Sequence, residues 1–187
     1  TSVWFGLAPL RSIPPTNAEG KPTKPAHVRS QLVHLEAVNC LFAEYDRKDY
    51  PDGALGHIVG LEYPPSVLVE SSPGSFHAYW LLADTFRLDS PADLERAKSA
   101  QAGWVNAVGG DTGAKDLTRV LRIPGTLNVK PKYAPDYPTV KTVYAHFDRL
   151  YTFEQLEAIA LPALTAAERT RAARTRSGQA HVVDFGE

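Results

Sequence analysis

The sequence predicts an α+β domain, because strand-like apolar runs and helical segments follow one another without the strict alternation of a doubly wound sheet. Three observations carry this prediction. An apolar run ends in CLFAEYD (40–46), two short apolar runs flank a Pro-Gly turn, and residues 89–108 have helical spacing. At 187 residues, the chain has the length of one domain or of a compact pair of subdomains.

The N-terminal third begins with a predicted strand in VWFGLAP (3–9). Residues 11–25 contain several Pro residues with Lys and Gly, which favours an exposed loop. The apolar run that follows is most strand-like at Leu41-Phe42-Ala43, and from 47 to 60 a polar composition with Pro51-Asp52-Gly53 predicts a loop and a short helix.

Residues 66–73 and 76–83 predict a β-hairpin. Both runs are apolar, and the second reads FHAYWLLA. Ser72-Pro73-Gly74-Ser75 lies between them, and Pro and Gly favour a tight turn. The two strands therefore pair with each other.

Residues 89–108 form the clearest predicted helix, with Ser90 as a cap candidate and Pro91 at its first turn. A turn, a strand fragment and a Pro-Gly turn follow in 116–130, another strand in 142–148, and a short helix in 152–160 that Thr152 could cap. The sequence after Leu164 is polar and basic. We therefore predict one domain over 1–163, which is long enough to be a catalytic domain. Residues 164–187 would be a basic linker or tail that leads toward a further C-terminal domain.

Composition excludes several classes of protein. The net charge is −1, from 20 basic and 21 acidic residues, so no overall field indicates a nucleic-acid or membrane partner, although a local basic groove remains open. The single Cys40 excludes an internal disulfide and a Cys-rich zinc module. It agrees with a cytoplasmic protein, and no apolar run approaches the roughly 18 residues of a membrane span.

Glu44 and Asp46 are the first candidate site residues. On a strand, residues i and i+2 point to the same face, so both carboxylates project together and Tyr45 points the other way. Neighbouring carboxylates with hard oxygen atoms suit Mg²⁺ or Mn²⁺. The alternative is that both acids lie at the solvent-exposed end of an edge strand.

Ser75 and His77 would share a face of the following strand. A hydroxyl and an imidazole beside a Gly turn suit the oxygens of a phosphate, and the N–H groups of the turn could contribute. The alternative is a histidine that is satisfied within a half-buried sheet.

Basic residues gather in a third segment, 115–130. It contains Lys115, Asp116, Arg119 and Arg122 around a short apolar core. Arginine makes bidentate contacts to phosphate, and lysine supplies a movable charge. The arginines could instead be surface ion-pair partners, which is a weaker explanation for Arg122 because it lies between Leu121 and Ile123.

Together, three acids, a Ser/His pair and an Arg/Lys cluster are what metal-assisted nucleotidyl transfer requires. Two divalent ions about 3.5–4 Å apart would activate the attacking hydroxyl and stabilise the leaving pyrophosphate. Cationic side chains would hold the triphosphate in line.

These motifs resemble the archaeo-eukaryotic primase superfamily. The resemblance rests on an ExD strand end, SxH, and an Asp before RxxRxPGTxN, and it spans roughly residues 1–160. It is closest to the primase–polymerases of plasmids, phages and CRISPR-associated or other mobile elements. It implies an RRM-like antiparallel sheet with flanking helices, a smaller αβ subdomain, and an active site in the cleft between them.

The resemblance also implies roles for single residues. Glu44, at a place where the family usually has Asp, and Asp46 would bind catalytic Mg²⁺ or Mn²⁺. Ser75 and His77 would contact the nucleotide phosphates. Asp116 would be the third acid, with Asp111 as a nearby competitor, and the remaining residues of the triphosphate-binding stretch would be Lys115, Arg119 and Arg122.

The leading hypothesis is a DNA-templated primase or polymerase that uses NTPs or dNTPs, with single-stranded template and primer as partners. Template contacts could come from Arg11, Lys21, Lys24, Lys132 and Tyr133. The family often carries a fused or associated helicase or a C-terminal primase domain. Two alternatives remain: a non-catalytic replication-initiation module that binds single-stranded DNA or nucleotide, and a nuclease, which would have no need of a triphosphate pocket.

Overall fold

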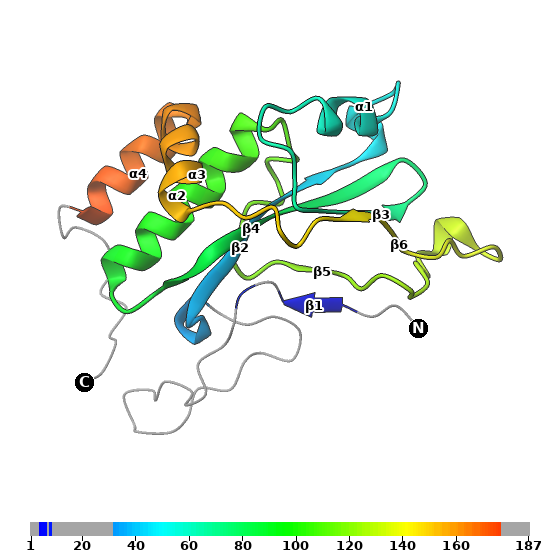
Figure 1. Cartoon of the computed structure of the whole chain (residues 1–187), viewed down its shortest axis with the longest axis horizontal. Helices are drawn as coiled ribbons and strands as arrows, with labels where there is room; N and C mark the ends of the chain where they lie inside the picture. The colour runs from blue at the N-terminus through cyan, green and yellow to red at the C-terminus, as the bar shows by residue number, and fades with distance from the viewer. Residues whose placement is uncertain (1–3, 7, 9–31, 177–187) are drawn as a thin grey trace.

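The computed structural model describes residues 4–6, 8 and 32–176. Figure 1 shows a sheet with helices on one side and a small strand pair on the other. The strands are β1 (Trp4–Gly6), β2 (Ala37–Tyr45), β3 (Val67–Ser72), β4 (Ser75–Arg87), β5 (Val120–Arg122) and β6 (Lys141–Ala145). The α-helices are α1 (Ala54–Val59), α2 (Pro91–Ala107), α3 (Phe153–Ala160) and α4 (Ala166–Arg176). Short 3-10 helices are η1 (Leu32–His34), η2 (Arg47–Asp49), η3 (Pro131–Tyr133) and η4 (Leu161–Ala163).

The main sheet has four strands in the order β2-β4-β3-β6, and all of its neighbours are antiparallel. Its centre is the predicted hairpin of β3 and β4. Gly74 lies in the turn with a φ of 75°, a conformation that glycine adopts without steric cost. The α+β class and the predicted hairpin are confirmed.

One face of the main sheet is covered by helices around an apolar core. Trp80 of β4 and Trp104 of α2 are fully buried and meet edge to face, with ring centroids 5.1 Å apart. Both predicted caps are present. The Ser90 side chain accepts a hydrogen bond from the backbone N–H of Asp93, and Thr152 forms a capping box with Gln155. These caps fix where α2 and α3 begin.

The other face of the main sheet has a smaller core beneath the β1–β5 pair. β1 and β5 are antiparallel and form a separate two-stranded sheet, which Figure 1 shows on the opposite side from α3 and α4. This second core contains Cys40, Phe42, Val69, Tyr79, Leu121 and Val140. Burial raises the pKa of the Cys40 thiol to about 12, so this thiol stays protonated and acts as a small apolar group.

The β2 strand lies at an edge of the main sheet, and a side chain pairs with its outer backbone groups. Gln101 of α2 is completely buried. Its Nε2 donates to the carbonyl of Phe42 (2.8 Å), and its Oε1 accepts from the Phe42 N–H (3.2 Å). One amide side chain thus satisfies both backbone groups of Phe42, as a neighbouring strand would.

The secondary structure differs most from the sequence expectations at β4 and after residue 163. β4 continues past 83 to Arg87 because Phe86 and Arg87 pair with Val38 and Ala37 of β2, a long-range pairing that the polar local sequence does not reveal. Residues 166–176 of the expected linker are helical, as α4. The domain boundary at 163 and a further C-terminal domain remain predictions.

The sequence contains a signal for α4. Thr165 and Glu168 form a reciprocal pair: the Thr165 N–H donates to Glu168 Oε2 (2.8 Å), and the Glu168 N–H donates to Thr165 Oγ1 (3.3 Å). This T-x-x-E spacing is that of a capping box. Glu168 also accepts from Asn106 of α2 and from Lys115, which attaches the start of α4 to the domain.

The expected loop over 11–25, with Arg11, Lys21 and Lys24, lies outside the described residues. No helix in the described part of the chain combines the length and the apolar composition needed to cross a membrane.

Candidate active site

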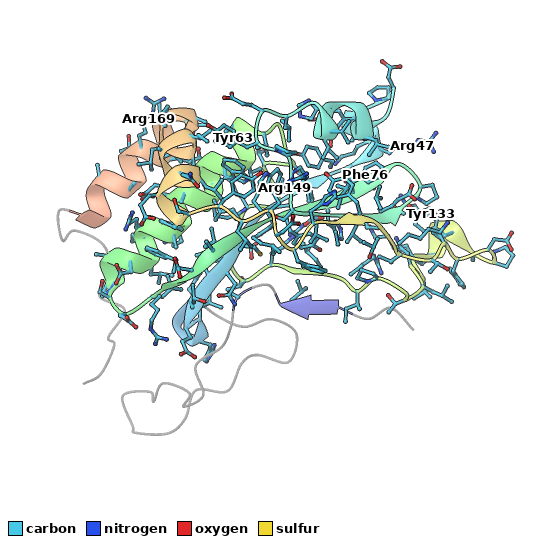
Figure 2. All side chains as sticks on the ribbon, viewed as in Figure 1. Arg47, Tyr63, Phe76, Tyr133, Arg149 and Arg169 are labelled. Carbon is cyan, nitrogen blue, oxygen red and sulfur yellow. The ribbon has the colours of Figure 1, made fainter. Side chains whose placement is uncertain are left out.

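A cavity of about 420 Å³ lies where β2, the β3–β4 turn and the segment after β5 meet. Arg47 and Tyr133, which both line it, are labelled at the same end of the molecule in Figure 2. Its lining carries carboxylates from the end of β2, and cationic side chains both from the residues that follow β2 and from residues 122–132. The lining residues are Glu44, Asp46, Arg47, Lys48, Ser71, Ser72, Pro73, Ser75, His77, Arg122, Asn128, Lys130, Lys132 and Tyr133.

Glu44 and Asp46 lie together in this cavity, as the spacing predicts. Tyr45, between them, is buried on the helix-covered face, with its side chain in the main core. The Asp46 side chain is 48% exposed, whereas the Glu44 side chain is 18% exposed. The strand end therefore holds one carboxylate inside the protein and one at the solvent boundary.

Arg119 is the cation against Glu44. Its Nε donates to Glu44 Oε1 (2.5 Å), and its Nη1 lies 3.8 Å from Asp116 Oδ2. Burial raises the pKa of Glu44 above its ordinary value, while the hydrogen bond and charge of Arg119 act in the opposite direction. Arg119 thus offsets part of the cost of holding a carboxylate away from water.

His77 lies directly opposite Glu44 on the neighbouring strand. Its Nε2 is 3.8 Å from Glu44 Oε2, and the residue is 5% exposed. Burial, followed by the charges of Arg122, Arg119 and Lys130, lowers the pKa of His77 to about 3. The imidazole is therefore neutral near pH 7, and among the described residues its Nδ1 has no hydrogen-bond partner.

Ser75 joins the hairpin turn to the acidic strand end. Its Oγ accepts a hydrogen bond from the backbone N–H of Arg47, the residue after Asp46 (3.2 Å). The O–H of Ser75 is still a donor in the cavity. The predicted Ser75/His77 pair is thus brought beside the predicted Glu44/Asp46 pair.

The end of β5 and the segment after it line another part of the cavity. They contribute Arg122, Lys130, Lys132 and Tyr133. Burial alone would raise the pKa of Tyr133, but hydrogen bonds from Ser72 and Lys132 and the nearby lysine charges lower it. Because several cationic groups face one small volume, this part of the cavity is suited to an anion.

Asn128 fixes the path of that segment. It is 1% exposed, and its Nδ2 donates to the backbone carbonyl of Ser71 on β3 (2.9 Å). Asn128, Arg47 and Lys48 also line the cavity, and no role was predicted for them from the sequence. For Asn128 the signal was available, since it is the last residue of the RxxRxPGTxN string.

Lys115 and Asp116 lie in a different place. They line a second cavity, of about 250 Å³, together with residues of α2 and α4. Lys115 pairs with Glu168, and Asp116 accepts a hydrogen bond from Thr118 Oγ1 (2.8 Å). The structure does not bring these two residues into the cavity that contains Glu44.

Asp111, the other candidate for the third acid, is joined to Glu44 by a hydrogen bond between backbone groups. Its N–H donates to the carbonyl of Glu44 (2.8 Å). The charges of Asp46 and Asp111 both act to raise the pKa of Glu44. Asp111 is therefore an acid whose charge is coupled to Glu44, although its side chain does not line the cavity.

The carboxylate oxygens of Glu44 and Asp46 are of the chemical type that binds a hard divalent cation. Carboxylate oxygens are the ligands that Mg²⁺ and Mn²⁺ prefer, and the guanidinium on Glu44 shows that this position accepts positive charge. Over residues 32–176 and the short N-terminal pieces, no three His, Cys, Asp or Glu side chains are grouped closely enough to hold a metal ion.

Comparisons with known proteins show the family and the fold to which the chain is similar. The family model for the RepB DNA-primase N-terminal domain matches residues 49–161, which is more than half of the chain. No curated protein matches the sequence.

Among solved structures, the AEP domain of the cyanophage S-2L primase-polymerase is similar, with a TM-score of 0.51, 20% identity, and coverage of 70% of this chain and 64% of that chain. The catalytic domain of primase RepB′ in complex with initiator DNA aligns with a TM-score of 0.45 at 17% identity over 81% of this chain and 66% of that one. The chain thus spans about two thirds of the lengths of these two structures. The expected α+β fold is that of the phage AEP domain, and the chain belongs to the RepB DNA-primase N-terminal domain family.

Proposed function

We propose that this chain is the catalytic domain of a DNA-templated nucleotidyltransferase, a primase or primase–polymerase that joins nucleotides from NTPs or dNTPs. One observation carries the proposal: a single cavity of about 420 Å³ is lined both by the Glu44/Asp46 pair and by Arg122, Lys130 and Lys132. A nucleoside triphosphate with bound metal ions needs both acidic and basic side chains. The basic side chains bind its anionic oxygens, and the carboxylates bind the metal ions. Membership of a primase family supports this choice.

Glu44 and Asp46, the two acids that line the cavity, are the residues that would hold Mg²⁺ or Mn²⁺. Bound divalent ions would lower the pKa of the attacking hydroxyl and stabilise charge on the leaving oxygens. Asp111, whose backbone N–H bonds to the Glu44 carbonyl, is a candidate for a further acid near this pair, although its side chain does not line the cavity. Asp116 remains the alternative, 3.8 Å from the Arg119 that pairs with Glu44.

The basic side chains of the cavity would hold the triphosphate. Arginine and lysine act here as fixed and movable positive charges on phosphate oxygens. Arg119, which pairs with Glu44, would add a further positive charge beside the triphosphate.

His77 would donate a hydrogen bond to a phosphate oxygen as a neutral imidazole. Its lowered pKa means that it offers an N–H without adding a charge beside Arg122 and Lys130. The Ser75 hydroxyl, which already accepts from the Arg47 N–H, keeps its proton for the same purpose. Both residues would orient the nucleotide and leave the acids free for cations.

The test incubates the protein with primed and unprimed single-stranded template, NTPs or dNTPs, and Mg²⁺ or Mn²⁺. Glu44→Gln/Asp46→Asn should lose at least about 100-fold in nucleotide incorporation, while Asp148→Asn, an exposed carboxylate outside the cavity, should match the wild type. Synthesis that persists in the double variant would overturn the assignment of the acids.

A binding module is the alternative class. It predicts tight single-strand or nucleotide binding by the wild type without incorporation under any metal condition. A His77→Ala variant separates roles further: it should raise the KM for nucleotide and leave Mn²⁺ affinity unchanged. Weaker Mn²⁺ binding by that variant would make His77 a ligand.

A further inference from the structure

Two lysines of the cavity lie on an excursion of the chain between β5 and β6. Residues 125–128 run out and residues 138–140 run back, and backbone hydrogen bonds of 2.8 Å join the two as a stem. Residues 129–137, which this stem carries, are called the basic loop here because they include Lys130 and Lys132. Figure 1 shows the excursion, in yellow-green, projecting beside β6. The stem bonds fix its own shape, so the place of the loop at the cavity depends on contacts with the main sheet.

Asn128, at the end of the stem, makes such a contact with β3. Its Nδ2 donates to the carbonyl of Ser71 (2.9 Å), a residue 57 positions earlier in the chain. Its Oδ1 accepts from the backbone N–H of Lys130 (3.4 Å). Asn128 and Ser71 are both buried. One amide therefore binds β3 with its donor and the first residues of the basic loop with its acceptor.

The same end of β3 is tied to the acidic strand end. The Ser71 hydroxyl donates to the carbonyl of Ser75 (3.3 Å), and Ser75 Oγ accepts from the backbone N–H of Arg47 (3.2 Å). Arg47 directly follows Asp46. The bond from Asn128 to Ser71 thus places the basic loop relative to the acids of the cavity.

Lys130 is the cation that depends most directly on this bond. It lines the cavity, and its charge acts on the buried His77, so both face the same volume. Tyr133, farther along the loop, has a tether of its own, because it hydrogen-bonds with Ser72 of β3. A lysine carries its charge on a flexible stem, so the place of the ammonium depends on where the backbone is held.

We propose that Asn128 is a positioning residue for Lys130: its amide holds the start of the basic loop at β3, so that the lysine ammonium faces the triphosphate. The inference rests on the proposed function, in which the basic side chains hold the triphosphate. An amide suits this task because it donates and accepts at the same time and adds no negative charge beside the phosphates.

Calorimetric titration with dATP, at a fixed Mg²⁺ concentration, measures the effect on affinity. Asn128→Leu removes both hydrogen bonds at nearly the same side-chain volume. It should weaken dATP binding about 5-fold, somewhat less than the roughly 10-fold loss expected for Lys130→Met, because the lysine charge is displaced and not removed.

The double variant Asn128→Leu/Lys130→Met tests whether Asn128 acts through Lys130. If it does, the double variant should bind dATP as weakly as Lys130→Met does, about 10-fold below the wild type. Independent effects would multiply to a loss of about 50-fold, which would overturn the positioning role.

Asn106→Leu is the matched control. Asn106 Nδ2 also donates to a backbone carbonyl, that of Ala163 (3.1 Å), and Asn106 does not line the cavity. A role of Asn128 in stability alone predicts that both Asn→Leu variants lower the free energy of unfolding and leave dATP affinity unchanged. Urea denaturation shows that each measured variant is folded. Asn128→Ala removes the same hydrogen bonds without a branched side chain, and takes the place of Asn128→Leu if that variant does not fold.

Lys130→Met separates the two ways of failing. If Lys130→Met weakens dATP binding while Asn128→Leu binds as the wild type does, the positioning role is wrong and the triphosphate site stands. If Lys130→Met binds dATP as the wild type does, both the triphosphate contact of Lys130 and the positioning role are wrong.

Discussion

The two faces of the main sheet use burial in opposite ways. The helix-covered face buries apolar rings such as Trp80 and Trp104, and its helices begin at side-chain caps. The cavity face buries polar groups at its edge, among them His77, Arg122 and Asn128. Burying a charge or an imidazole costs stability unless partners offset it, whereas burying a ring contributes stability. The helix-covered face therefore supplies the stability that offsets the cost of the buried polar and charged side chains on the cavity face.

The largest effect on the free energy of unfolding should come from a large-to-small substitution in the helix-covered core. Trp104→Ala removes a fully buried ring that packs against Trp80, and should lower the free energy of unfolding by about 3–5 kcal/mol. Urea denaturation measures it. Phe147→Ala, at a residue that is 72% exposed, is the control and should change stability by no more than about 0.5 kcal/mol. A small loss for Trp104→Ala would mean that this face does not carry the stability.

The cavity face should show the reverse pattern. Lys130→Met removes one of three cations whose charges lower the pKa of His77. Because like charges repel, stability should hold or rise, while the affinity for a nucleoside triphosphate should fall about 10-fold. Calorimetric titration with dATP and urea denaturation give the two values, with the exposed Lys141→Met as control. Unchanged affinity would remove Lys130 from the triphosphate-binding residues.

The smallest effect concerns the attachment of α4, and it depends on pH. Burial alone would raise the pKa of Glu168, but hydrogen bonds from Lys115, Thr165 and Asn106 lower it from 4.5 to about 2. A lowered carboxyl pKa contributes stability that is complete above about pH 4.5 and is lost as the pH falls toward 2. Glu168→Gln should therefore cost about 1 kcal/mol at pH 7 and less at pH 3.

Urea denaturation at pH 7, 5 and 3 would measure this difference. Glu154→Gln, whose side chain is 68% exposed, is the control and should show no comparable trend. A cost for Glu168→Gln that grows on acidification would contradict the assigned direction.

Local patterns in the sequence predicted most of the fold, because turns, caps and alternation are local properties. The Ser72–Ser75 turn, the Ser90 cap and the Thr152 cap are examples. The extension of β4 to Arg87 was not predicted, because it depends on pairing with Ala37 and Val38, some fifty residues earlier. The Thr165/Glu168 box at α4 was present in the sequence but was outweighed by the basic composition around it.

The candidate site was predictable in its residue types and less so in their grouping. Glu44, Asp46, Ser75, His77 and Arg122 line one cavity, and Arg119 pairs with Glu44 at its edge. Spacing could not distinguish Asp111 from Asp116, because both precede the arginines. The difference comes from the Gly109-Gly110 turn, which brings the Asp111 backbone to Glu44, while Lys115 and Asp116 line the second cavity. The metal ligands and the nucleotide contacts stay predictions.

The contact of Gln101, a residue of α2, with the edge strand β2 affects how copies of this protein can associate. An edge strand with free N–H and carbonyl groups is a template on which another chain can add a strand, the first step of sheet-to-sheet aggregation. Gln101 occupies both groups of Phe42 in the middle of that edge. The amide thus blocks strand addition where the strand is most apolar, and protects the edge without a charge or a proline.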